Sequence, residues 1–111
     1  MKPLAHFSFF ESLEIRVGRV VEVEAAHTKK PAYRITVDFG PEIGTKVSCG
    51  AYTNYSREQL IGTLVIGVVN FAPKKMGPET SEVLILGVLN EKGETIYLAP
   101  ESNVLAGSKI F

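Results

Sequence analysis

Apolar and polar residues alternate along much of this chain, and this period of two restricts the fold more than any other feature of the sequence. The clearest example is YRITVDF, residues 33–39. Its inward set is predicted to be Tyr33, Ile35, Val37 and Phe39, and its outward set Arg34, Thr36 and Asp38. Because successive side chains of a strand point to opposite faces of a sheet, the pattern predicts a strand with one buried face.

Similar patterns predict further strands on both sides of this one. A long first strand is expected over 15–25, with a bulge or sharp bend at Gly18. Its predicted core residues are Ile15, Val17, Val21, Val23 and Ala25. The other predicted strands are 45–50, 63–71, 81–89 and 94–100. The segments GPEIG and NEKGE are expected to be turns.

One short helix is predicted between the third and fourth strands. Ser56 opens the segment SREQLIG, Gln59 stands at the position that completes a capping box, and Gly62 provides a stop. Five or more short strands with a helix at this place favour an all-β, five-stranded Greek-key OB-fold barrel. A small sandwich is the alternative, but it needs no helix there.

Another short helix is predicted before the first strand, around Phe7–Leu13, with Ser8 as its cap and Glu11 completing a capping box. It carries three phenylalanines, namely Phe7, Phe9 and Phe10. These rings either fill the core or meet a partner subunit.

Two lysine pairs fall in the loops that border the ligand surface of an OB-fold. The loop joining the first two strands reads HTKKPAYR, and the loop after the fourth strand reads APKKMGPET. The residues expected on this basic rim are Lys29, Lys30, Arg34, Lys46, Lys74 and Lys75, with Asn70 and Ser81 as hydrogen-bond donors to a base or sugar. Tyr33 is near the rim but is in phase with the core residues, so we expect it to pack inward.

The composition excludes several function classes. Lys plus Arg equals Asp plus Glu at 12 each, so any polyanion site must be a local patch. The single cysteine, Cys49, allows neither an intrachain disulfide nor a multi-thiolate metal site, and His6 and His27 belong to no metal or catalytic motif. We therefore expect a single domain over 1–111 that is not an enzyme and holds no metal or cofactor. The absence of a long apolar run or a signal-peptide pattern predicts a cytoplasmic protein with no membrane insertion.

The order of the segments resembles a known family. From Phe9 onward, the stretches IRVGRVVEVE, YRITVDFG, KVSCGAYTNYSREQLIGTLVIGVVNFAPKKM, SEVLILG and ETIYLAPESNVLAGSKI are similar to the tRNA-binding-domain family. The short loop AAHTKKPAYRI and the segment FAPKKMGPETSEVLILG are most similar to the branch of the export-related chaperone CsaA. Val83 stands where synthetase-type members of the family have glycine.

The resemblance implies an OB-fold whose terminal elements form a homodimer. The interface residues that it implies are Phe7, Phe9, Phe10, Leu105 and Ile110. It also implies two activities: binding of unfolded or precursor polypeptides in support of export, with the secretion machinery as a further partner, or recognition of tRNA by shape through the basic rim.

For the chaperone activity we expect an apolar peptide groove. Its expected residues are Phe39, Phe71 and Met76, rimmed by Lys74 and Lys75. The strand phase of Phe39 and Phe71 also fits a core position, whereas Met76 lies in the loop.

Overall fold

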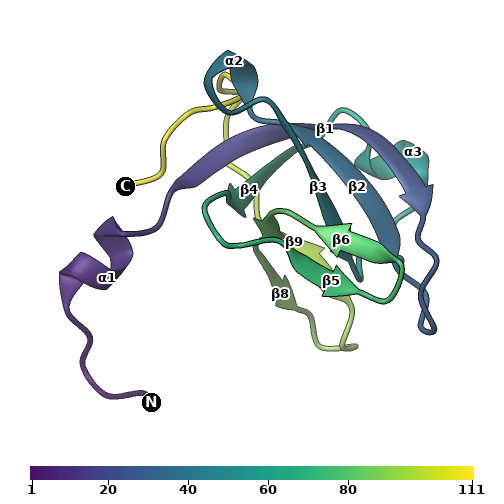
Figure 1. The fold of residues 1–111 in the computed structure, drawn as a ribbon, viewed down its shortest axis with the longest axis horizontal. Coiled ribbons are helices and arrows are strands. Elements are labelled where there is room, and N and C mark those ends of the chain that lie inside the picture. Colours follow the sequence, from purple (N-terminus) through teal and green to yellow (C-terminus); the bar gives the residue numbers. More distant parts are fainter.

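The computed structural model describes residues 1–111 and is built around a five-stranded antiparallel sheet, ordered β3-β2-β1-β4-β7 (Figure 1). The strands are β1 (Ile15–Ala25), β2 (Tyr33–Asp38), β3 (Thr45–Gly50), β4 (Leu64–Val68) and β7 (Leu84–Ile85). Between β3 and β4 lies α3 (Arg57–Leu60), where Ser56 and Gln59 form the predicted capping box.

The sheet curls until its two edges nearly meet. Beside β7, the backbone N–H of Glu82 donates to the carbonyl of Val47 in β3 at 2.7 Å. The N–H of Cys49 donates to Ser81 Oγ at 3.1 Å. These bonds join β3 to the segment just before β7, so the sheet is a nearly closed barrel and the predicted OB-fold architecture is confirmed.

The long strand β1 serves both halves of the barrel. Its first half, from Ile15 to Arg19, pairs with β4, and its second half, from Arg19 to Ala25, pairs with β2. The register shifts between Val20 and Glu22, so the bulge lies at Val21 and not at Gly18 as predicted. Before the bulge Gly18 and Val20 face the core, and beyond it the extra residue reverses the phase, so that Val23 is buried. Val21 and Ala25 are exposed, so their predicted inward positions are wrong.

Gly18 has a different role, which is to let a neighbouring ring approach the strand. A Cβ atom at position 18 would lie 2.7 Å from Cε1 of Phe39 and would also collide with Val37. The absence of a side chain therefore allows Phe39 to pack directly on the β1 backbone.

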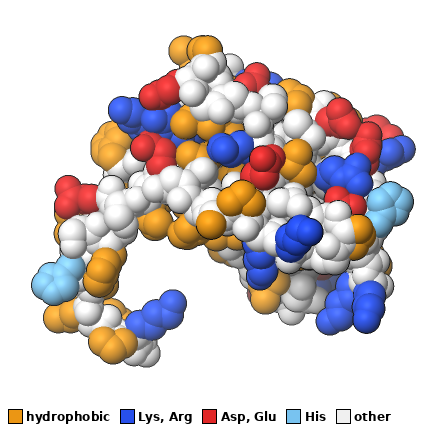
Figure 2. Space-filling view, in the orientation of Figure 1, with side chains coloured by type: hydrophobic (Ala, Val, Ile, Leu, Met, Phe, Trp, Pro, Cys, Tyr) orange, Lys and Arg blue, Asp and Glu red, His pale blue; other side chains and the backbone are white.

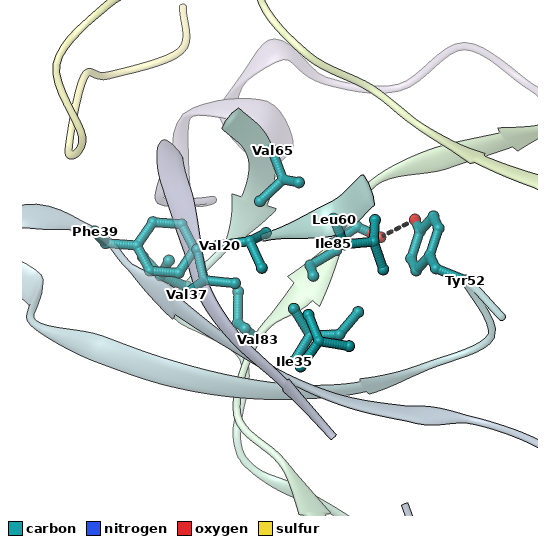
Figure 3. Close-up of a cluster of buried hydrophobic side chains, with 11 residues drawn as sticks. Val20, Ile35, Val37, Phe39, Tyr52, Leu60, Val65, Val83 and Ile85 are labelled. Atoms are coloured by element: carbon teal, nitrogen blue, oxygen red, sulfur yellow. Dashed lines mark hydrogen bonds between the residues drawn. The ribbon is translucent and has the colours of Figure 1, made fainter. Parts of the chain in front are cut away.

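The core fills the barrel interior, as Figure 3 shows. The predicted inward face of β2 is confirmed, since Ile35, Val37 and Phe39 are fully buried and Tyr33 packs against them. Tyr52 closes one end of the core and donates its hydroxyl to the carbonyl of Ile85 at 3.1 Å (Figure 3). No buried side-chain polar atom lacks a hydrogen-bond partner.

Two hairpins extend the barrel where the sequence analysis predicted simpler elements. The predicted loop over 72–80 contains β5 (Lys74–Met76) and β6 (Glu79–Ser81), which pair around Gly77. The predicted strand over 81–89 is divided into β7 and β8 (Gly87–Leu89), and β8 pairs with β9 (Thr95–Tyr97). The predicted turn at GPEIG is the one-turn helix α2 (Gly40–Ile43), which has Pro41 in its first turn.

The N-terminal segment stands apart from the barrel (Figure 1). Its helix α1 (Phe7–Glu11) has no buried residue and no side-chain cap, and Ser8 lies inside it, so the predicted capping box is wrong. Phe7, Phe9 and Phe10 are 71%, 64% and 39% exposed, so the interpretation that they fill the core is also wrong. The helix lies away from the barrel, and the barrel interior is already filled by other side chains.

The segment 107–110 covers the edge of β1 that β2 leaves free. Val17 N donates to the carbonyl of Ser108 at 2.9 Å, and Ile110 N donates to that of Ile15 at 3.0 Å. The buried guanidinium of Arg16 donates to Gly107 O at 3.0 Å and forms an ion pair with Glu42 at 2.9 Å. This ion pair, reinforced by Glu14, raises the pKa of Arg16 and lowers that of Glu42.

No helix in the structure combines the length and the apolar character needed to cross a membrane.

Candidate ligand-binding groove and basic rim

An open groove of about 510 Å³ lies where β3, β5 and β7 come together. Most of its lining is apolar. The lining residues are Ser48, Cys49, Gly50, Ala51, Tyr52, Phe71, Ala72, Lys74, Met76, Ser81, Glu82, Val83, Leu84 and Ile85. Phe71 and Leu84 are about half exposed, at 49% and 50%, so apolar surface is accessible to a ligand.

The groove contains three of the residues expected to bind a peptide. Lys74 and Met76 lie two positions apart on β5 and both line the groove. Lys75, between them, is exposed but does not line it, because alternate residues of a strand face opposite ways. Phe71 lines the wall just before β5.

Phe39 is not part of the groove, and the expectation that it would be is wrong. Its side chain is fully buried, packed against the backbone at Gly18 and Gly67. The alternation that places Ile35 and Val37 in the core also turns Phe39 inward.

Sequence reasoning missed Tyr52, Leu84 and Ile85 as groove residues. Leu84 and Ile85 belong to an apolar segment that the pattern predicts as core, and Tyr52 lies in the polar loop after β3. Only the closure of β3 against the segment before β7 brings them beside β5. No local pattern carries this information.

The hairpin β5–β6 is held against the β1–β2 loop by a buried carboxylate. Glu79 is 6% exposed and accepts from Arg34 Nε and Nη2, each at 2.9 Å. It also accepts from the backbone N–H of His27 at 3.0 Å. These donors, Arg34 first, lower the pKa of Glu79 to about 2.

The two lysine-bearing loops are therefore joined through Glu79. Lys29 and Lys30 follow His27 in one loop, and Lys74 and Lys75 lie on the hairpin that Glu79 anchors. All four lysines are exposed, and none takes part in an ion pair. Figure 2 shows basic and hydrophobic side chains side by side over this hairpin.

Arg34 does not belong with these free cations. Besides its two bonds to Glu79, it donates from Nη1 to Glu24 at 2.9 Å. Every nitrogen of its guanidinium is thus used within the protein, so we exclude Arg34 from the proposed phosphate contacts. Lys46 lies on β3 opposite Val37 and is half-buried.

The two predicted hydrogen-bond donors are also engaged within the chain. Asn70 Nδ2 donates to the carbonyl of Ser12 at 2.9 Å, and Asn70 Oδ1 accepts from Glu14 N at 2.8 Å. Ser81 Oγ accepts from Cys49 N and donates to the carbonyl of Val83 at 3.3 Å. Asn70 therefore connects the chain after β4 to the segment before β1, and Ser81 connects β6 to β3 beside the groove.

We expect Glu79 to stay ionised in acid far below the usual range of a glutamate. Its pKa falls from an ordinary 4.5 to about 2, so the pair's contribution to stability is complete above pH 4.5 and is lost as the pH falls through about 2. Carboxyl carbon NMR should give a titration midpoint near 2. A midpoint at or above 4.5 would show that Arg34 does not hold this carboxylate.

The thiol of Cys49, which lines the groove, is not activated as a nucleophile. Burial raises the pKa of the Cys49 thiol, which favours the unreactive protonated form. No cluster of three or more His, Cys, Asp or Glu residues that could hold a metal ion is present.

Comparison with known proteins gives a consistent family assignment. The family model described as "Putative tRNA binding domain" matches residues 15–109. The crystal structure of the chaperone CsaA from Bacillus anthracis is similar with a TM-score of 0.91 and 39% identity, covering 98% of this chain and 100% of that one. The CsaA chaperone protein from Picrophilus torridus gives a TM-score of 0.92 and 38% identity, covering 97% and 100%.

A methionine–tRNA ligase from Methanocaldococcus jannaschii is 35% identical over 103 residues. The match covers 93% of this chain but only 16% of the ligase, so the similarity concerns a small part of that enzyme. The family match over nearly the whole barrel and the agreement of the folds lead to one conclusion: this chain belongs to the tRNA-binding-domain family.

Proposed function

We propose that this protein is a CsaA-like chaperone that binds unfolded or precursor polypeptides. The observation that carries the proposal is the half-exposed apolar groove bordered by the unpaired Lys74. Two solved CsaA chaperones, similar to this chain over their whole length, support it. We place this activity in the cytoplasm, before export, with the secretion machinery as the receiving partner.

The groove can hold an extended chain without requiring a particular sequence. Apolar side chains of the ligand enter between Phe71, Met76 and Leu84, and the flexible thioether of Met76 adapts to their shape. Lys74 offers three donors at the edge of the groove, where ligand carbonyls and carboxylates remain accessible. Burial of apolar surface supplies most of the affinity.

We also propose that two copies associate through their terminal segments. Phe7, Phe9 and Phe10 are exposed, with aromatic contacts only to one another and to His6, and Leu105 is 84% exposed. Ile110, which is half-buried and donates its N–H to the carbonyl of Ile15, is the second residue of the C-terminal segment that we assign to this interface. A homodimer has two grooves, and a long unfolded chain that engages both is held by avidity.

Binding of tRNA is the second candidate function. It is favoured by the four exposed, unpaired lysines on two loops that Glu79 joins. The revised basic rim is Lys29, Lys30, Lys74, Lys75 and, on β3, Lys46. Phosphate contacts by such lysines position a folded RNA without reading its sequence.

The variant Lys74→Ala/Lys75→Ala separates the two functions. Wild-type protein should capture a reduced, unfolded polypeptide with similar affinity at about 50 and 200 mM salt, because apolar burial is screened little by salt. The double substitution should weaken this capture by no more than about fivefold, because one of the two lysines lies off the groove. Fluorescence anisotropy with a labelled polypeptide measures both quantities.

Bulk tRNA is the parallel probe, with Lys92→Ala/Lys109→Ala as the charge-matched control. If tRNA is the ligand, affinity falls with a log–log slope of about −0.7 to −0.9 per phosphate contacted, and only the 74/75 variant reduces that slope. Tight tRNA binding of this kind, with no capture of the polypeptide, would replace the chaperone proposal by the second candidate.

A further inference from the structure

The hairpin that forms one wall of the groove has few connections to the barrel. Strand β5 pairs only with β6 in a separate two-stranded sheet. Strand β6 is connected through Ser81 Oγ to Cys49 N at one end and through Glu79 at the other. The position of Lys74 and Met76 therefore depends on what holds β6 in place.

Glu79 is the connection at the turn end of the hairpin. It pairs directly with Met76 across the turn at Gly77, whose φ of 64° allows the chain to reverse. Its buried carboxylate is held by the fork of Arg34 and by the His27 amide. A bidentate Arg–carboxylate pair fixes orientation as well as distance.

Arg34 in turn is fixed to the barrel wall. It lies on β2 opposite Cys49 of β3 and Glu24 of β1, and Glu24 accepts from its remaining terminal nitrogen. The guanidinium, carried by β2, thus connects β1 and β2 to the hairpin. The Glu79 pKa of about 2 agrees with a carboxylate that is held ionised by these donors.

We propose that Glu79 and Arg34 are positioning residues of the groove: they hold the β5–β6 hairpin so that Lys74 and Met76 form its wall. The inference rests on the proposed function, because it explains how the proposed polypeptide site is kept in shape. It gives Arg34 a role in binding without any contact between Arg34 and the ligand.

The variant Glu79→Gln tests the proposal, since it keeps the shape of the side chain but places an amide NH₂ against the Arg34 donors. Labelled, reduced and carbamidomethylated α-lactalbumin is the probe. Its affinity should fall about tenfold, and amide exchange over 74–81 should accelerate about tenfold, because a buried guanidinium–carboxylate contact is lost. If the substitution acted through charge alone, the affinity would rise instead. The reason is that it removes a negative charge beside the lysines, and this probe is itself acidic.

Glu24→Gln is the matched control. It removes the same charge and one bond to the same guanidinium, but it leaves the Arg34–Glu79 fork intact. Its affinity and hairpin exchange should stay within about twofold of wild type. Arg34→Lys keeps the charge and loses the fork, so it should give an intermediate loss even if Glu79→Gln folds poorly.

The outcomes separate this inference from the proposed function. If the wild-type protein binds the probe and Glu79→Gln binds it equally well, the positioning role is wrong and the chaperone proposal stands. If the wild-type protein does not bind, the chaperone proposal fails, and exchange alone decides the positioning role. Unchanged exchange at residues 74–76 in Glu79→Gln would overturn it.

Discussion

Replacing Phe39 with alanine is expected to lower the free energy of unfolding by about 3–5 kcal/mol. The ring is fully buried, and its Cζ and Cε1 atoms lie against the backbone at Gly67 and Gly18. Because glycines have no side chains that could move into the vacated space, the cavity should persist and the loss should fall in the upper part of this range. Urea unfolding followed by circular dichroism measures it.

Phe71→Ala is the matched control for this experiment. It removes the same side chain from a position that is 49% exposed, so its cost should stay below about 1 kcal/mol. Its effect should instead appear as weaker polypeptide capture, because Phe71 lines the groove. Equal losses of stability for the two variants would contradict the assignment of Phe39 to the core and Phe71 to the surface.

The triple substitution Phe7→Ala/Phe9→Ala/Phe10→Ala should convert the proposed homodimer into monomers. Burying one such ring contributes about 1.5–3 kcal/mol, so removing three from each copy should raise the dissociation constant by about a thousandfold or more. Alanine preserves the helix, and no residue of α1 is buried in its own chain, so the barrel should remain folded. Sedimentation velocity at micromolar concentration measures the association.

Val21→Ala/Ile61→Ala is the corresponding control, since both side chains are exposed hydrophobics on the barrel, at 46% and 48%. This variant should remain dimeric. A wild-type protein that sediments as a monomer, or a triple variant that still dimerises, would refute the association through α1.

The sequence predicts those parts of the barrel whose signal lies within a few consecutive residues. Strand β2 alternates without interruption, and the capping box at Ser56 and Gln59 needs only four consecutive residues, so both are confirmed. The bulge at Val21 is different, because it depends on β1 changing partner from β4 to β2. A glycine in the strand suggested the wrong place for it, since Gly18 is required by the ring of Phe39 and not by a bulge.

In the candidate site, too, the sequence predicts what depends on local pattern and misses what depends on contacts between distant residues. The lysine pairs are visible in the sequence because the OB-fold topology places their loops on one rim. The pairing of Arg34 with Glu79 is not, because the two residues are 45 positions apart and both read as solvent-exposed charges. Sequence reasoning therefore counted Arg34 as a free cation and found no role for Glu79.

The pairing of residues 107–110 with the start of β1 has a consequence for how the protein forms during synthesis. Gly107, which accepts from the Arg16 guanidinium, lies 91 positions after it in the sequence. The edge of β1 is therefore covered, and the guanidinium has all its acceptors, only when residues 107–110 are present. Until that segment leaves the ribosome, the nascent barrel presents an open strand edge beside an uncovered Ile15. Nascent chains that still lack residues 107–110 should be the most prone to pair with one another through this open edge.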